Sequence, residues 1–543
     1  MDDKYNSRRP TRLIAKDYFE YLGRQLPQQC ASDEFYFFPR AESARHHLNI
    51  LDDMKPEKIQ DHVQHVKKLL REMSSDEADD LEEEINRLLL KQSMKSFVRE
   101  FEGSEIWRYD PTLYVKIPLF ATDHILSKRG SHPDEIGTDL LTIFDQIPSF
   151  LNVAIKNLYH PSEISIRVAL DMVRDAIHFF RHEIPAFVAE KSSGDKEIFK
   201  KNRDVLGAWD RYSKELLNCS TRESFSIGED GLEEILAVSL NYTKSLKEIL
   251  ETARYSYQKT QERLRTLARK IDGTKRWDLI IYEQRPSISS SEELMELFEK
   301  QAQDLRRFFY TQDIIPYPSG ENLHILQTPS YLKSLRATAS YRAPLTRNAG
   351  DHGVFYVTPG KEDLELTASH CTYLTAHETY PGHHILDHLR IHYSNPIRRQ
   401  IESPLFYEGW ACYAEGLLDE LGYVQDPREQ LIGLKRQLWR NLRAALDEEL
   451  QTGTITLDQA AKKIEALGFS AQRAQRQVRR FCLTPGYQLC YSMGMHEILG
   501  LRERFSPLLE LGTFHKTLLG GGQLPFHLVE RRLGAIGDSY SRG

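Results

Sequence analysis

The chain has 543 residues and a mildly acidic balance, with 72 lysines and arginines against 79 aspartates and glutamates and a formal charge of -7. The two signs are mixed along the sequence, which argues against the concentrated basic surface of a nucleic-acid-binding protein. Hydrophobic residues make up 40% of the chain. This fraction is enough for a substantial hydrophobic core. The length fits one large helical enzyme or two lobes about a cleft.

The sequence shows no sign of export or membrane insertion. Its first residues are polar up to Leu13 and no run of eighteen apolar residues occurs, so we expect neither a signal peptide nor a membrane span. The six cysteines are scattered without a Cys-x-x-Cys pair. This pattern is typical of a reducing compartment and argues against a cysteine-bound metal. We therefore predict a cytoplasmic protein.

Residues 1–312 have the pattern of an α-helical scaffold. Apolar residues recur at helical spacing within charged segments, most clearly from 242 to 270. Ser291, followed by two glutamates, favours the start of a further helix that runs to about 311. No cluster of residues suited to catalysis lies in this part. We expect it to be continuous with the rest of the chain around one cleft.

The pattern changes between 313 and 360, where proline, glycine and β-forming residues dominate. Three short runs predict the strands of a small sheet, at 323–326, 339–342 and 353–358. Metal-binding helices are expected at 365–420, followed by further helices to the C-terminus. The predicted fold class is mainly α, with residues 313–543 forming the catalytic region.

Residues 377–384 read His-Glu-Thr-Tyr-Pro-Gly-His-His and form the densest group of metal-type ligands in the chain. In the pattern His-Glu-x-x-His, two histidines one helical turn apart bind zinc and the glutamate activates water. Here Pro381 stands at the second histidine's position. Pro381 and Gly382 can bulge the expected helix at 366–380 so that His383 replaces it. His384 is the less favoured alternative, because about 10 Å of helix rise would separate it from His377.

A second helix is expected to supply the third ligand. Glu408 and Glu415 lie two helical turns apart on one face of the segment 407–415. We predict His377, His383 and Glu408 as zinc ligands with an open fourth position, although imidazole also accepts iron, nickel or copper. Glu378, next to a ligand, is the predicted general base. Glu415 either orients a ligand histidine or lies on the helix surface.

Three motifs, in order, resemble those of the DUF885 family of uncharacterised bacterial proteins. They are HETYPGHH at 377–384, EGWACYAE at 408–415 and PGYQLCYSMG at 485–494. Members typically carry HExxPGHH, EGWAxYxE and PGQAxxYxxG. The family in turn resembles gluzincin metallopeptidases such as the thimet oligopeptidase and angiotensin-converting enzyme groups. The resemblance implies a two-lobed helical fold with a small sheet beside the active-site helix, and cleavage of short peptides.

The same resemblance implies roles for residues beyond the metal ligands. Tyr491 matches a family position suited to stabilising an oxyanion, with Tyr487 in reserve. The strand at 353–358, which contains Tyr356, would pair with an extended substrate unless it is a plain connecting hairpin. The histidine of the pair that does not bind metal would contact substrate, which makes His384 a predicted substrate-binding residue alongside Tyr356 and Tyr487.

Two other functions stay open at this stage. One is a metal enzyme that hydrolyses another small amide or carries out iron or copper redox chemistry, because Tyr487 and Gln451 depart from the family pattern. The other is a binding protein without turnover, against which the intact Glu378 argues. An arginine among the four at 473–480 could hold a substrate carboxylate. We expect a peptide or small amide as partner, no nucleic acid or membrane, and a fold compatible with a homodimer.

Overall fold

The computed structural model describes residues 9–73, 80–127, 133–191, 196–283, 285–317, 319–333, 336, 339–347, 352–359 and 364–541. Within these ranges the chain is mainly helical and contains one sheet of three short strands. The prediction of a mainly α fold with a small sheet is confirmed. Among the described helices, none combines the length and the apolar character needed to cross a membrane.

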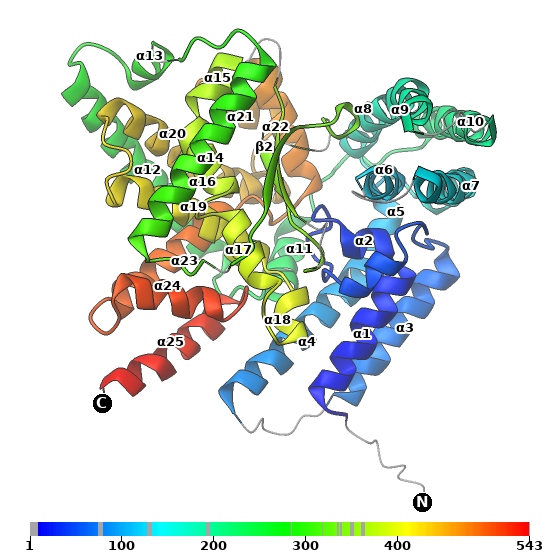
Figure 1. Ribbon diagram of the computed structural model, residues 1–543, viewed down its shortest axis with the longest axis horizontal. Helices are drawn as coiled ribbons and strands as arrows, with labels where there is room; N and C mark the ends of the chain where they lie inside the picture. The colour runs from blue at the N-terminus through cyan, green and yellow to red at the C-terminus, as the bar shows by residue number, and fades with distance from the viewer. Residues whose placement is uncertain are drawn as a thin grey trace, which may run out of the picture.

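Helices of the first 220 residues lie mostly on the right of Figure 1. Their apolar residues fall on one face: in α10, for example, Ile198, Val205 and Tyr212 are buried two turns apart. The helices are α1 (Thr11–Gln25), α2 (Pro27–Ala31), α3 (Pro56–Glu72), α4 (Leu81–Val98), α5 (Ile106–Tyr109), α6 (Leu113–Leu126), α7 (Pro133–Asn157), α8 (Glu163–His178), α9 (Ile184–Lys191) and α10 (Lys196–Asn218).

The later helices lie mostly on the left of Figure 1. The helix predicted at 242–270 is confirmed as α12 and begins at Leu246, because Ser245 and Glu248 form a capping box. Before the sheet lie α11 (Gly228–Glu234), α12 (Leu246–Ile271), α13 (Trp277–Tyr282) and α14 (Ser291–Gln312). After it come α15 (Leu364–Ser369), α16 (Cys371–Glu378), α17 (His383–Arg390), α18 (Pro396–Gln400), α19 (Pro404–Glu420), α20 (Pro427–Gln451), α21 (Leu457–Glu465), α22 (Ala471–Leu483), α23 (Cys490–Phe505), α24 (Leu511–Gly520) and α25 (Phe526–Ser541).

All three predicted strands are present, as β1 (Leu323–Gln327), β2 (Ala339–Arg342) and β3 (Gly353–Val357). The order is β1-β3-β2, with β3 parallel to β1 and antiparallel to β2. Because β3 is paired along both sides, it offers no free edge. The prediction that this strand pairs with an extended substrate is therefore wrong. Phe298 of α14 packs edge-on against Phe355 at 5.5 Å between ring centroids and buries the strand.

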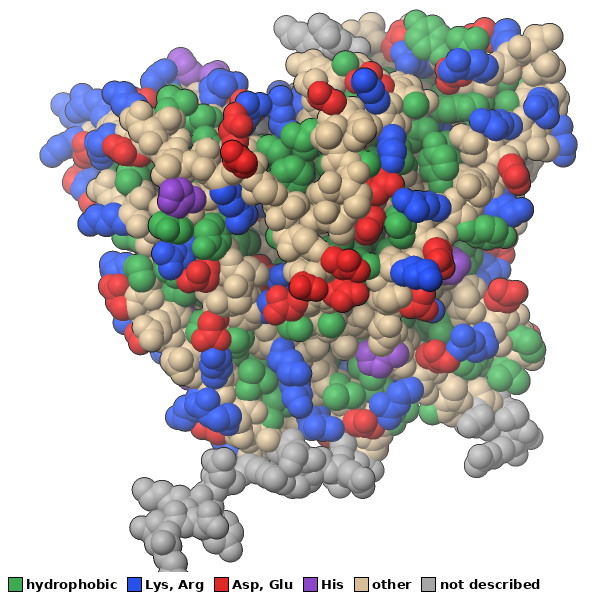
Figure 2. Space-filling view, turned by 180° about the vertical axis from the view of Figure 1, so that it is seen from behind, with side chains coloured by type: hydrophobic (Ala, Val, Ile, Leu, Met, Phe, Trp, Pro, Cys, Tyr) green, Lys and Arg blue, Asp and Glu red, His purple; other side chains and the backbone are tan. Residues whose placement is uncertain are grey.

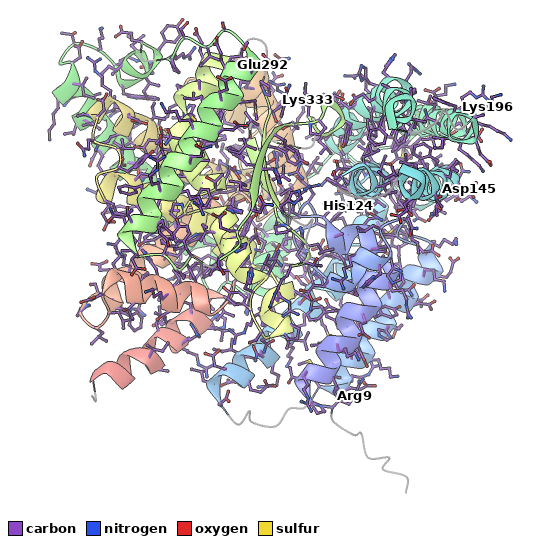
Figure 3. The ribbon with its side chains drawn as sticks, viewed as in Figure 1. Arg9, His124, Asp145, Lys196, Glu292 and Lys333 are labelled. Atoms are coloured by element: carbon purple, nitrogen blue, oxygen red, sulfur yellow. The ribbon has the colours of Figure 1, made fainter. Side chains whose placement is uncertain are left out.

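Two apolar clusters form the core. The larger runs from Ile14 in α1 to Leu533 in α25, with the β1 residues Leu323 and Ile325 packed against it. The buried sheet residues Ala339, Phe355 and Val357 belong to a smaller cluster with α14. In Figure 3, His124 on α6 and Lys333 beyond β1 lie on either side of the junction between the sheet and α6 to α9. His124 contacts Gln28 of α2 at 3.0 Å. Figure 2 shows basic and acidic side chains interspersed over the rear face, as the mixed charge of the sequence predicts.

Helices α19 and α23 meet backbone to backbone at Gly409 and Gly494. A Cβ added to Gly409 would lie 2.4 Å from the carbonyl carbon of Gly494, and one added to Gly494 would lie 2.0 Å from the oxygen of Leu405. No side chain fits at either position without moving a helix. The two glycines thereby place the third sequence motif directly against the second.

Gly409→Ala is expected to lower the free energy of unfolding by about 1–3 kcal/mol or more, because the helices must separate. Gly416→Ala, in the same helix, is the control, since nothing lies within 4 Å of its added Cβ. That change should be neutral or stabilise by up to about 1 kcal/mol. Urea denaturation of both variants measures the difference. Equal effects would contradict the close contact.

Candidate metal centre

The predicted helix at 366–380 is broken in the structure, and the break forms the site. Helix α16 ends at Glu378 and α17 begins at His383, with 379–382 folded back between them. The amide of Gly382 donates to the carbonyl of Ala376 at 3.0 Å. A Cβ on Gly382 would lie 1.9 Å from the His377 oxygen, so only glycine fits this turn. Trp410 fixes it by donating to the Pro381 carbonyl at 2.9 Å.

This turn brings His383 back beside His377, with 4.7 Å between their ring centroids. The Glu408 Oε2 atom of α19 lies 3.5 Å from Nε2 of His377 and 3.6 Å from Nε2 of His383. One potential ligand atom from each residue lies within 4.8 Å of the others, and all three residues are buried. The structure therefore brings together the three predicted ligands and places His383, not His384, in the group.

The distances within the cluster match those of a metal site, and one carboxylate oxygen is free to coordinate an ion. Ligands about 2.0–2.1 Å from a tetrahedral zinc lie about 3.4 Å from one another, close to the carboxylate–imidazole distances here. Glu408 Oε2 is buried and makes no hydrogen bond with the described residues, although it faces the Nε2 atoms of His377 and His383 at 3.5 and 3.6 Å. A buried carboxylate oxygen without a hydrogen bond is costly unless a cation faces it, and a metal ion among these three residues would be such a cation. The donor set therefore fits zinc.

Glu415 holds His377 from behind the cluster. Its carboxylate lies 3.0 Å from His377 Nδ1, leaving Nε2 to face Glu408. It also accepts hydrogen bonds from Arg436 at 2.8 Å and from Arg440 at 2.7 Å. Of the two alternatives for Glu415, the structure favours the orienting one, because the residue is buried against a predicted ligand.

Charge around the cluster is tightly balanced. Burial alone would raise the pKa of Glu415, but the guanidiniums of Arg436 and Arg440 hold it well below its usual range. Burial lowers the pKa of His377, yet contacts with Cys412, Glu408 and Glu415 raise it well above its ordinary value. Since a histidine must lose this proton to bind a metal, proton and metal compete at His377.

Tyrosines contact the other two predicted ligands, Glu408 and His383. Tyr487 donates from its hydroxyl to Glu408 Oε1 at 2.6 Å. Tyr407 stacks on the ring of His383 at 3.9 Å between centroids and donates to Asp387 at 2.9 Å. Tyr487 was predicted to bind substrate. The structure shows that its hydroxyl contacts the predicted ligand Glu408.

Asp447 holds the turn that carries Tyr487. Its buried carboxylate accepts the backbone N–H groups of Gly486 at 3.1 Å, Gln488 at 2.7 Å and Leu489 at 3.3 Å. Burial raises the pKa of Asp447 to about 7, against the lowering effect of these donors. The side-chain amide of Gln451, one turn further along α20, donates to the carbonyl of Phe481 at 3.3 Å.

His384 points away from the cluster. Its Nε2 atom lies 2.8 Å from Glu321 and its Nδ1 atom 3.2 Å from the hydroxyl of Tyr341. Glu321 also accepts from Tyr380 at 2.7 Å. Because both ring nitrogens are engaged, the predicted contact of His384 with substrate would require one of these bonds to break. Tyr356 is likewise buried, with the guanidinium of Arg336 4.9 Å from its ring.

Of the two predicted catalytic residues, Glu378 directly follows the predicted ligand His377 in α16. It is buried, and its carboxylate makes no hydrogen bond or ion pair with any residue in the described ranges. The ring of Tyr491 lies parallel to that of His377 at 6.4 Å. Burial and the charge of Glu408 raise the pKa of Tyr491 far above its usual value, which keeps its hydroxyl protonated. Tyr491 therefore offers a phenolic donor beside His377, and Glu378 offers a carboxylate without partners at the next position in the chain.

A cavity of about 380 Å³ adjoins this group. Tyr36 and Tyr487 stack at 4.0 Å between ring centroids and form part of its wall, together with Phe35, Phe225 and Pro485. The volume is within the range of small-ligand sites. Since Tyr487 also contacts Glu408, the tyrosine pair separates the cavity from the predicted ligands.

Comparison with known proteins places these motifs in a family. A family model described as "Bacterial protein of unknown function (DUF885)" matches residues 41–533. The chain belongs to the DUF885 family. The predicted family resemblance is thereby confirmed, while the further resemblance to gluzincin peptidases stays a prediction. No curated protein matches this DUF885 chain.

Two solved structures share the fold. One, from Shewanella oneidensis, is described as "a putative lipoprotein of unknown function"; it is 19% identical with a TM-score of 0.75, over 95% of this chain and 98% of that one. The other is described as "the putative lipoprotein from Colwellia psychrerythraea"; it is 18% identical with a TM-score of 0.81, over 98% and 100% of the two chains. At these identities the likeness shows the fold alone.

Sequence reasoning missed several residues of this DUF885 site. Tyr407 stands next to a predicted ligand, and its place in the motif was an available signal. Arg440 lies in a segment with helical periodicity, but no local pattern indicates that its side chain contacts Glu415. Tyr36 and Glu321 come from distant segments, and no local pattern indicates them. Tyr36 also shows that the predicted N-terminal scaffold reaches the site.

Proposed function

We propose that this DUF885 protein is a zinc-dependent hydrolase that cleaves amide bonds in short peptides. The observation that carries the proposal is the convergence of His377, His383 and Glu408, which are buried together around a carboxylate oxygen that makes no hydrogen bond among the described residues. Three protein ligands leave a fourth zinc position open, as hydrolytic sites require. Short peptides are proposed as substrates because the resemblance to gluzincins implies them.

When bound, zinc would lower the pKa of a water molecule towards neutrality and polarise the scissile carbonyl. Glu378 would accept the proton of the attacking water and return it to the departing amine. The Tyr491 hydroxyl would donate a hydrogen bond to the oxyanion. Tyr487 and Glu415 would hold Glu408 and His377 in place through the contacts described above.

We also propose the cytoplasm as the compartment. The six cysteines are all free, which suits reducing conditions. Both structural neighbours are described as lipoproteins, which indicates a location outside the cytoplasm for those proteins. Fractionation of the producing cell and labelling of the mature N-terminus decide between the two locations.

Elemental mass spectrometry of protein purified without added metal is expected to find about one zinc per chain. His377→Ala should lose this zinc, because only two protein ligands are left. His496→Ala, an exposed histidine on α23, is the control and should keep it. Iron or copper at the same stoichiometry would favour redox chemistry, and no metal after zinc is supplied would contradict the proposal.

A further inference from the structure

The cavity of about 380 Å³ has a largely apolar wall. Its aromatic and aliphatic side chains come from separate segments: Phe35 and Tyr36 follow α2, Tyr109 ends α5, and Phe225 and Ile227 precede α11. All five are half-buried, so each keeps apolar surface that the fold itself does not cover. A ligand in the cavity would remove such surface from water.

The charged groups of the same wall nearly balance. Three bases face four acids around the cavity: Arg99, Lys116 and Arg222 against Glu34, Glu100, Asp110 and Glu234. Arg99 contacts Glu100 at 2.6 Å and Glu234 at 3.4 Å. Since neither sign dominates, a charged ligand would gain less from this wall than an apolar one.

The remaining two bases lie over aromatic rings of the wall. The Lys116 ammonium lies 5.9 Å from the centroid of the Phe35 ring, and the Arg222 guanidinium lies 5.1 Å from that of Tyr109. Both distances are within the range of a cation–π contact. These contacts hold the two rings of the wall in place.

Tyr487 joins the cavity to the predicted metal centre. Its ring stacks on Tyr36 at 4.0 Å in the cavity wall, and its hydroxyl donates to Glu408 at 2.6 Å. One tyrosine side chain therefore spans the distance between the cavity and a predicted ligand. Consecutive Cα atoms of a peptide are about 3.8 Å apart, so a residue one or two positions from the cleaved bond can reach past this ring.

We propose that the cavity binds a large apolar side chain of the substrate, and aromatic ones best, within two residues of the cleaved amide bond. This inference rests on the proposed hydrolase function. Aromatic rings favour edge-to-face and offset contacts with other rings, and Phe35, Tyr109 and Phe225 offer such rings from three segments of the chain. Burial of the side chain against this wall supplies the binding free energy.

Kinetics with matched peptides test the proposal. The peptides differ only in carrying Phe, Ala or Glu at one of the two positions on either side of the cleaved bond. At one of these positions, the zinc-loaded enzyme should cleave the Phe peptide with about tenfold to a hundredfold higher kcat/KM than the Ala peptide. Equal values at all four positions, or the highest value for a Glu peptide, would overturn the proposal.

Two variants place a carboxylate in the wall. Phe225→Asp and Ile227→Asp should each remove most of the preference for Phe, because an apolar side chain would then bury a charge. Leu217→Asp is the control and should keep the preference, because Leu217 lies on α10 with 68% of its surface exposed. Thermal unfolding identifies a variant that fails to fold, and the other one then supplies the comparison.

Binding separates this proposal from the hydrolase function. Ligand-observed NMR with zinc-loaded protein should show N-acetylphenylalaninamide binding at least about tenfold tighter than N-acetylalaninamide. Phe225→Asp and Ile227→Asp should lose that difference. Apolar-selective binding without turnover would support the cavity and reject the hydrolase. Equal binding of the two amides, or a difference that both variants keep, would reject the cavity as the side-chain site even if peptides are cleaved.

Discussion

Glu378→Gln is expected to retain zinc and to lower kcat by about 10²–10⁴-fold, the usual contribution of a general base. Gln has nearly the shape of Glu but cannot accept the proton of the attacking water. Glu378 is not among the converging ligand atoms, so its replacement leaves the donor set complete. Its carboxylate is also free of partners among the described residues, so the change breaks no observed hydrogen bond or ion pair. Metal content and peptide turnover, measured on one preparation, check both halves of the expectation.

The control for this variant is Glu365→Gln, an exposed glutamate on α15. It changes the net charge by the same amount and should leave kcat within about twofold, because it lies away from the reacting atoms. The stability of the two variants should also agree. If Glu378→Gln lost zinc to the same extent as His377→Ala, Glu378 would be a ligand or a structural residue and not the base.

Local patterns predicted most elements that position the site. Helical periodicity and capping residues indicated α12 and α14, and runs of β-forming residues indicated the three strands. The positions of His377 and Glu408 followed from motif spacing. These patterns depend on residues that are close in the sequence, so they can be recognised without knowledge of the tertiary structure.

What the sequence could not indicate depends on contacts between distant segments. The order of strands places β3 in the centre, and strand composition alone does not reveal which strand has a free edge. Which of His383 and His384 lies beside His377 depends on the turn at Gly382, where an added Cβ would lie 1.9 Å from the His377 oxygen. In the structure it is His383. The partner of His384 is Glu321, 63 positions earlier in the chain.

The network around Glu415 connects stability to metal binding, because the same carboxylate serves two purposes. It neutralises Arg436 and Arg440, and it orients His377. The Glu415 and Arg440 side chains are only 4% and 5% exposed. Removal of the single acid would therefore leave two arginines without their counter-ion in a place that water barely reaches.

Glu415→Gln is accordingly expected to lower the free energy of unfolding of the metal-free protein by about 3–5 kcal/mol and to weaken zinc binding by about 10–100-fold. Urea denaturation and competition with a chelator of known affinity measure the two effects. Glu420→Gln is a matched control, because Glu420 lies on the same helix and pairs with Arg502, but its side chain is 44% exposed. A surface pair of this kind contributes about 0–1 kcal/mol and lies outside the ligand set. If both variants lost stability equally while Glu415→Gln kept full zinc affinity, Glu415 would be an ordinary ion-pair residue and would not orient His377.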